Sequence, residues 1–104
     1  MDYRVLITPD AENDLEEFVK YFVIDKKNKQ AAENLLNDFE LTLENLERVA
    51  GSLRYCDNPR LSELGYKKIH FIAHRYFLLF RLEGNKAVVD AVFHELQDYE
   101  NKIR

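Results

Sequence analysis

The chain has 104 residues, the size of one small domain, and its 46% hydrophobic and 33% charged residues are enough to bury a core without metals or disulfides. With three glycines and two prolines, it is neither a disordered nor a low-complexity chain. The formal net charge of -4 argues against binding nucleic acid through bulk charge, although it leaves room for a local basic patch.

Residues 3–8 are rich in β-forming side chains and predict a short strand. Thr8-Pro9-Asp10 then supplies a hydroxyl N-cap, a proline at the first helical position and an acid in the first turn, a pattern typical of a helix start. The apolar face of the helix that follows is Ala11, Leu15, Phe18 and Phe22.

A second, longer helix is predicted after a polar loop at residues 25–29, with Asn28 as its N-cap. Its apolar stripe is Ala32, Leu36, Phe39, Leu43, Leu46 and Ala50. Gly51 stands where a left-handed C-terminal cap belongs. The acids on the outer faces of both helices, Asp38 among them, are expected to be solvated.

The second half of the chain predicts three strands after an irregular connection at residues 52–64, which contains Asn58-Pro59 and shows no period. The strand-like runs are residues 66–72, 75–82 and 86–94. Gly84-Asn85 suits a two-residue hairpin turn between the last two runs. The predicted fold is α+β, a single domain over residues 1–104 in the order β-α-α-β-β-β. Its two N-terminal helices pack on one face of a mainly antiparallel four-stranded sheet.

The turn at Gly84-Asn85 fixes which residues of the last two strands face each other. Counting back from it pairs Arg81 with Val88, Leu79 with Asp90, and Arg75 with His94. One side of the hairpin is then almost wholly apolar and is predicted to lie beneath the helices. It consists of Tyr76, Leu78, Phe80, Leu82, Ala87, Val89, Ala91 and Phe93.

The opposite side of the sheet collects cations. If Ala73-His74 turns the preceding hairpin, Tyr66, Lys68, His70 and Ile72 join this side. It then carries Lys68, His70, Arg75, Arg81, Lys86 and His94 against one acid, Asp90. A solvated polar face is the plain alternative. Cations set between aromatic and apolar neighbours nevertheless suit phosphate groups and stacked bases, so we expect a nucleic-acid-binding surface.

No sequence motif points to a cofactor or a metal ion, and none is expected. The chain lacks a glycine-rich phosphate loop, a nucleophile elbow and a cysteine–histidine metal spacing. Its single cysteine, Cys56, is expected to be a bystander and fits a reducing compartment. No apolar run approaches the roughly 18 residues that span a bilayer, and the N-terminus shows no secretory signal. A cytoplasmic protein without a membrane partner is therefore predicted.

Four segments carry a family resemblance. They are Tyr3 to Ala11 with Asp14-Leu15, Gly65 to Ile69, Tyr76 to Arg81, and His94 to Tyr99. Together they resemble the RelE/ParE superfamily of bacterial toxins from type II toxin–antitoxin modules, over essentially the whole chain. The resemblance implies two N-terminal helices on a mainly antiparallel sheet. It also implies a small cytoplasmic toxin held inactive by a cognate antitoxin that the adjacent gene encodes.

The resemblance implies two different targets. RelE-like toxins cut mRNA on the ribosome without a metal, because the 2′-hydroxyl of the RNA attacks, and this endoribonuclease activity is the first hypothesis. ParE-like toxins poison DNA gyrase without catalysis, which is the alternative, and a decayed toxin that only binds its antitoxin is a third. Glu95 and Gln97 stand where the gyrase-directed ending usually has glycine and arginine, and ribosome-directed toxins are usually strongly basic, so both targets stay open.

For the nuclease, His94 is the best general acid or base, since only histidine titrates near neutral pH without perturbation. Arg75, expected beside it, would clamp the phosphate with two parallel hydrogen bonds, and Lys68 is the third catalytic candidate. The candidates for substrate binding are Arg81, Tyr66, His70 and Tyr99, the tyrosines by stacking on bases and His70 also as a second possible base. The alternative role for His94 is that of a strand-end histidine that caps backbone groups.

Overall fold

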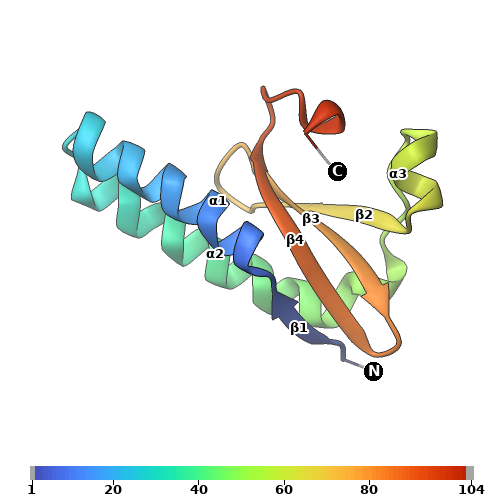
Figure 1. Ribbon diagram of the computed structural model, residues 1–104. Coiled ribbons are helices and arrows are strands. Elements are labelled where there is room, and N and C mark those ends of the chain that lie inside the picture. Colours follow the sequence, from blue (N-terminus) through green and yellow to red (C-terminus); the bar gives the residue numbers. More distant parts are fainter. Residues whose placement is uncertain (1, 103–104) are drawn as a thin grey trace.

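The computed structural model describes residues 2–102 and consists of a four-stranded sheet with two long helices packed along one face (Figure 1). The strands are β1 (Arg4–Ile7), β2 (Tyr66–His70), β3 (Tyr76–Glu83) and β4 (Lys86–His94). The helices are α1 (Pro9–Lys20), α2 (Lys29–Val49) and the short α3 (Pro59–Glu63), with a π-helical turn at Tyr21–Asp25 and 3-10 turns at Ala50–Ser52 and Tyr99–Asn101. Within residues 2–102, none of the helices is both long and apolar enough to cross a bilayer.

The sheet has the strand order β1-β4-β3-β2. β1 runs parallel to β4, and the other two pairings are antiparallel. The predicted α+β class and the predicted packing of two helices on a mainly antiparallel sheet are confirmed. The structure adds α3, which lies in the segment where the sequence predicts an irregular connection.

Side-chain caps explain where the helices begin. The Thr8 hydroxyl accepts the Ala11 N–H at 3.3 Å, and the Asn28 side chain accepts the Ala31 N–H at 3.0 Å, so both predicted N-caps are confirmed. Asn58 does the same for α3, whose Leu61 is fully buried. The prediction of irregular structure there was wrong because an Asn cap followed by proline is sufficient to start a helix of five residues.

Gly51 is not the left-handed helix cap that the sequence predicts but a point of close packing. It lies in the 3-10 turn after α2 without a positive φ, so the expected left-handed cap is wrong. A Cβ at this position would clash with the Tyr3 phenol. The Tyr3 N–H also donates to the Glu47 carbonyl at 2.8 Å. The glycine therefore allows the segment before β1 to pack closely against the end of α2.

A β-bulge interrupts the pairing of β3 with β4. Near the turn the predicted register is confirmed, with Arg81 opposite Val88. Phe80 then pairs with Val89 but Leu79 pairs with Ala91, so Asp90 is one residue in excess on β4. The predicted partners Leu79–Asp90 and Arg75–His94 are therefore wrong.

The bulge moves every later residue of β4 to the other face of the sheet. Ala91 and Phe93 lie with Phe77 and Leu79 on the face away from α1 and α2, whereas Val92 belongs to the core beneath those helices. His94 lies opposite Tyr76. The predicted sides hold for β3, for β2 and for residues 86–89, and they are reversed from Ala91 to His94.

The face away from α1 and α2 is not an open surface. Its centre is a second apolar cluster that consists of Cys56, Leu61, Phe77, Leu79, Ala91 and Phe93, with Tyr66 and Tyr99 packed against it. α3 and the C-terminal 3-10 turn supply Leu61 and Tyr99, and so cover part of this face. The expectation of an open cationic face is wrong for its central positions, because α3 and the C-terminal turn cover an apolar cluster there. Burial also raises the pKa of the Cys56 thiol, which fits the bystander role.

Asp38 on α2 is buried, with 4% of its surface exposed, and it organises the loop between β2 and β3. Its two carboxylate oxygens accept the main-chain N–H of Ile72 at 3.0 Å, that of Ala73 at 2.9 Å and the Nδ1–H of His74 at 2.6 Å. The expectation that this acid is solvated was wrong. Burial raises the pKa of Asp38, but the hydrogen bonds from His74, Ala73 and Ile72 outweigh burial and leave the pKa below its ordinary value.

We expect Asp38→Asn to lower the free energy of unfolding by about 2 kcal/mol at pH 7, because an amide has one acceptor oxygen for the three donors that now meet the buried carboxylate. Since the pKa of Asp38 is lower in the folded state than in the unfolded chain, its stabilisation is complete at neutral pH and is lost as the pH falls below about 4. Urea unfolding at pH 7 and pH 3 should show the gap between parent and variant closing. Asp57→Asn, at a side chain 88% exposed, is the control and should change neither value.

Candidate functional site

The predicted site residues separate into three groups. Tyr66, Lys68 and His70 share one face of β2 with Arg81 of β3, since Tyr66 pairs with Arg81 and His70 with Phe77, as predicted. Tyr99 joins this face from the C-terminal turn. Arg75 lies in the loop before β3, and His94 lies on the other face of the sheet with Tyr76. The expected set of His94, Arg75 and Lys68 is therefore not brought together.

Lys68 is held between two aromatic rings. Its Nζ lies 5.1 Å from the ring centroid of Phe77 and 5.1 Å from that of Tyr99, and it donates to the Tyr99 hydroxyl at 3.4 Å. Both rings attract the ammonium group through their negative faces. The Tyr99 ring also packs edge-on against Phe77, with centroids 5.0 Å apart. Tyr99 is thus occupied with Lys68 and the second apolar cluster.

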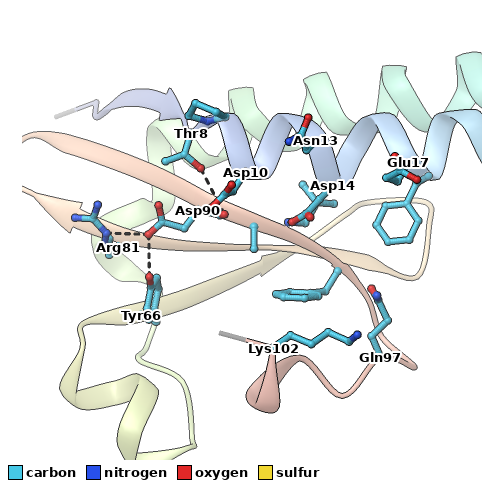
Figure 2. A pocket seen from close by; sticks show the side chains of 15 residues that line it. Thr8, Asp10, Asn13, Asp14, Glu17, Tyr66, Arg81, Asp90, Gln97 and Lys102 are labelled. Carbon is cyan, nitrogen blue, oxygen red and sulfur yellow. Dashed lines mark hydrogen bonds and ion pairs between the residues drawn. The ribbon is translucent and has the colours of Figure 1, made fainter. Parts of the chain in front are cut away.

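The carboxylate of Asp90, the bulged residue, binds two more of the predicted site residues on this face, Arg81 and Tyr66 (Figure 2). Arg81 Nε donates to Asp90 Oδ2 at 2.8 Å, and the Tyr66 hydroxyl donates to the same oxygen at 2.9 Å. Arg81 also forms an ion pair with Glu83. Burial raises the pKa of Tyr66, and the hydrogen bond to Asp90 and its negative charge raise it further. Two acids therefore neutralise Arg81.

Another acid, Glu95, connects His70 with Arg75. One of its oxygens lies 3.5 Å from His70 Nδ1 and the other 3.4 Å from Arg75 Nε. The Glu95 N–H also donates to the Arg75 carbonyl at 2.9 Å. Sequence reasoning missed Glu95 because the register without the bulge placed His94 beside Arg75. The one sequence signal for the bulge is Asp90 itself, an acid inside an otherwise apolar strand.

His94 caps backbone groups at the end of β4. Its N–H donates to Gln97 Oε1 at 2.8 Å, and its Nδ1 accepts the Leu96 N–H at 3.1 Å. Accepting this bond requires a lone pair on Nδ1, which places the proton of the neutral ring on Nε2. The ring packs edge-on against Tyr76, with centroids 5.0 Å apart. This geometry agrees with the alternative role that the sequence left open for His94.

A groove of about 940 Å³ runs between α1 and the part of β4 that extends beyond β1. Four polar residues of α1 line it, namely Asp10, Asn13, Asp14 and Glu17, together with Pro9 and Phe18, and Figure 2 shows Gln97 and Lys102 on the opposite side from Asp14 and Glu17. Three of these four carry a carboxylate, so the α1 wall is acidic.

Side chains cap the edge of β4 along this groove. The Thr8 hydroxyl donates to the Asp90 carbonyl at 3.4 Å, and Asp14 Oδ2 accepts the Val92 N–H at 3.0 Å. Gln97 Oε1 accepts the main-chain N–H of His94, two residues further along the same edge of β4. Backbone groups that a fifth strand would use are thus satisfied by side chains from outside the sheet.

A second, more apolar groove of about 680 Å³ lies where the π-helical turn meets the end of the sheet. Its lining includes Phe18, Tyr21, Phe22, Ile24, Tyr76 and His94. Among residues 2–102, no cluster of three His, Cys, Asp or Glu side chains is arranged to hold a metal ion.

We expect Asp90→Asn to lower the pKa of Tyr66, because the substitution removes the negative charge that disfavours the phenolate and leaves Arg81 beside it. Tyrosine ring-carbon NMR across an alkaline titration measures this pKa directly. Tyr76 is the internal control, since burial raises its pKa and Asp90 does not contribute. An unchanged Tyr66 titration, or an equal shift at Tyr76, would contradict the assigned network.

Comparison with known proteins places the chain in a family. A family model for the ParE toxin of the type II toxin–antitoxin system parDE matches residues 5–99. The fold is similar to a structure of the chromosomal ParDE system from P. aeruginosa (TM-score 0.72, 17% identity), over 88% of this chain and 95% of that chain. It is also similar to a chain of the toxin–antitoxin complex RelBE2 from Mycobacterium tuberculosis (TM-score 0.61, 18% identity), over 90% and 99% of the two chains.

A third similar structure is that of a conserved hypothetical protein from Helicobacter pylori (TM-score 0.57, 12% identity), over 88% of this chain and 93% of that chain. Comparison with curated protein sequences gives no match. At these identities the solved structures show the shared fold, and the family model, which spans nearly the whole chain, shows the family. The chain belongs to the ParE toxin family of type II toxin–antitoxin systems.

Proposed function

We propose that this toxin arrests growth by binding a protein target, DNA gyrase, and not by cleaving RNA. The observation that carries the proposal is the bulge at Asp90, which removes His94 from the face that holds Lys68 and Arg81. Membership of the ParE family supports the same choice.

RNA cleavage by 2′-hydroxyl attack needs a base, a cation at the phosphate and an acid for the leaving oxygen, all around one phosphorus atom. Here Lys68 lies between two rings, and Arg81 is paired with Asp90 and Glu83. His94 is on the opposite face and caps its own turn. A binding surface needs none of these groups to converge, so the geometry favours binding over catalysis.

The endoribonuclease alternative has one specific observation in its favour. His70 and Arg75 are brought together by Glu95, and they are a histidine and a guanidinium on mostly exposed side chains. In that alternative His70, and not His94, would be the acid or base. The experiment that tests the proposed function therefore includes both histidines.

We also propose that the cognate antitoxin docks in the groove between α1 and β4 and adds a strand to the capped edge. The relatives that support an antitoxin partner are the ParDE system and the RelBE2 complex. The α1 wall carries Asp10, Asp14 and Glu17, so a basic extended segment fits its charge. Such a strand would replace the side-chain caps at Val92 and His94 with backbone hydrogen bonds.

We expect purified parent protein to bind gyrase and inhibit its supercoiling activity, and His94→Gln and His70→Gln to retain this inhibition, because no proton transfer is involved. Primer extension on a translated message is the complementary measurement and should show no codon-phased cuts with any of the three proteins. Cutting by the parent that falls on the order of a hundredfold in either variant would instead establish the nuclease and identify its histidine.

For the antitoxin, we expect the double variant Asp10→Lys and Glu17→Lys to weaken the complex by at least tenfold at low salt, because it reverses two charges that line the groove. Calorimetry with the product of the adjacent gene measures the affinity. Glu12→Lys with Glu16→Lys is the matched control: the same change in net charge, on exposed positions of the same helix outside the groove. Equal weakening by both pairs would mean that the antitoxin responds to net charge and not to this groove.

A further inference from the structure

Two exposed aliphatic side chains stand at the same end of the sheet. Among residues 2–102, Leu96 at 83% and Ile72 at 65% are the most exposed of the large apolar residues. Ile72 belongs to the β2–β3 loop, which also contains Arg75, and Leu96 follows Glu95. The hydrogen bond from the Glu95 N–H to the Arg75 carbonyl joins the two segments, and Figure 1 shows the β2–β3 loop beside the C-terminal end of β4.

Both segments are held in fixed conformations. The buried carboxylate of Asp38 accepts the Ile72 N–H, and His94 Nδ1 accepts the Leu96 N–H. The N–H groups of the β2–β3 loop could bind water, but the buried Asp38 carboxylate is costly unless it accepts hydrogen bonds. The loop therefore stays bound to Asp38. Single exposed apolar residues are ordinary. Here, however, two of them are presented on pre-ordered backbone, which lowers the entropic cost of binding a partner.

We propose that Ile72, Arg75 and Leu96, together called the tip surface, form the contact with the target protein; this inference rests on the proposed function. The partner it fits is a protein surface with an apolar depression and uncharged hydrogen-bond acceptors beside it. Arg75 is 78% exposed, and its ion pair with Glu95 is weak in water, so the guanidinium can donate to such acceptors. Arginine is among the residue types enriched in binding hot spots.

The charge at the tip surface favours a protein over RNA. The Glu95 carboxylate lies within 3.5 Å of both nearby basic groups, His70 Nδ1 and Arg75 Nε, and would repel a phosphate placed there. The apolar side chains on either side also offer nothing to a sugar–phosphate backbone, whose contacts come from cations and hydrogen-bond donors. A protein surface that offers an apolar depression and uncharged acceptors satisfies all three residues without placing a second anion beside Glu95.

The test compares the parent, Ile72→Ser, Leu96→Ser and the double variant for affinity to purified gyrase. We expect each single variant to bind at least tenfold more weakly and the double variant to lose growth arrest, while antitoxin affinity and the melting temperature stay at the parental values. The matched controls are Leu41→Ser and Leu64→Ser, both at leucines 51% exposed away from the tip surface, and they should bind gyrase within twofold of the parent.

Parental gyrase affinity in the double variant would overturn the tip surface and leave the proposed function intact. Failure of the parent itself to bind gyrase would overturn the proposed function. Glu95→Gln separates the two kinds of partner, because it removes the charge that opposes phosphate. A gain in affinity for ribosomal or messenger RNA in this variant, with toxicity rising in parallel, would overturn the assignment of a protein partner.

Discussion

Asp90 is one residue more than β3 can pair with, and the arrangement of both sheet faces follows from how that extra residue is accommodated. Its carboxylate accepts hydrogen bonds from Arg81 and Tyr66, and its carbonyl accepts the Thr8 hydroxyl. These bonds hold the acid at the sheet and fix the register change beside it. Phe93 is thereby turned toward α3 and Tyr99, Val92 toward α1 and α2, and His94 away from Lys68.

The two long helices and the β3–β4 hairpin were predictable because each has its own chemical signal. Thr8-Pro9 and Asn28 start the two long helices, and Gly84 occupies the hairpin turn with φ +61°. The bulge was not predictable from alternation, because both faces of the sheet are buried near it. Ala91, Val92 and Phe93 are all apolar, so shifting the register by one residue exchanges one acceptable core residue for another. Only Asp90 itself marks the interruption.

The candidate site was partly predictable for the same reason. Strand periodicity correctly placed Tyr66, Lys68, His70 and Arg81 on one face. It set six cations against Asp90 alone and did not find Glu95, which lies after the bulge and pairs with His70 and Arg75. It also did not find the contact of Asp38 with His74, because Asp38 comes from a helix distant in sequence. An acid among the polar positions of a helix reads as solvated unless the loop that it meets is known. Counter-ions joined across long sequence separations therefore convert an apparently basic face into a set of paired groups.

The pairing of β1 with β4 constrains when the sheet can form. β1 forms its pairs with β4, and the Thr8 hydroxyl meets the Asp90 carbonyl across 82 residues of sequence. During synthesis, α1 and α2 emerge long before the strand pair that they are to cover, so the helical hairpin alone has no sheet against which to bury its apolar stripe. Contacts of such separation also slow folding, because a large loop is closed before they stabilise anything. The surfaces that depend on β4 therefore form only after residues 86–94 have been synthesised, well after the residues of both long helices.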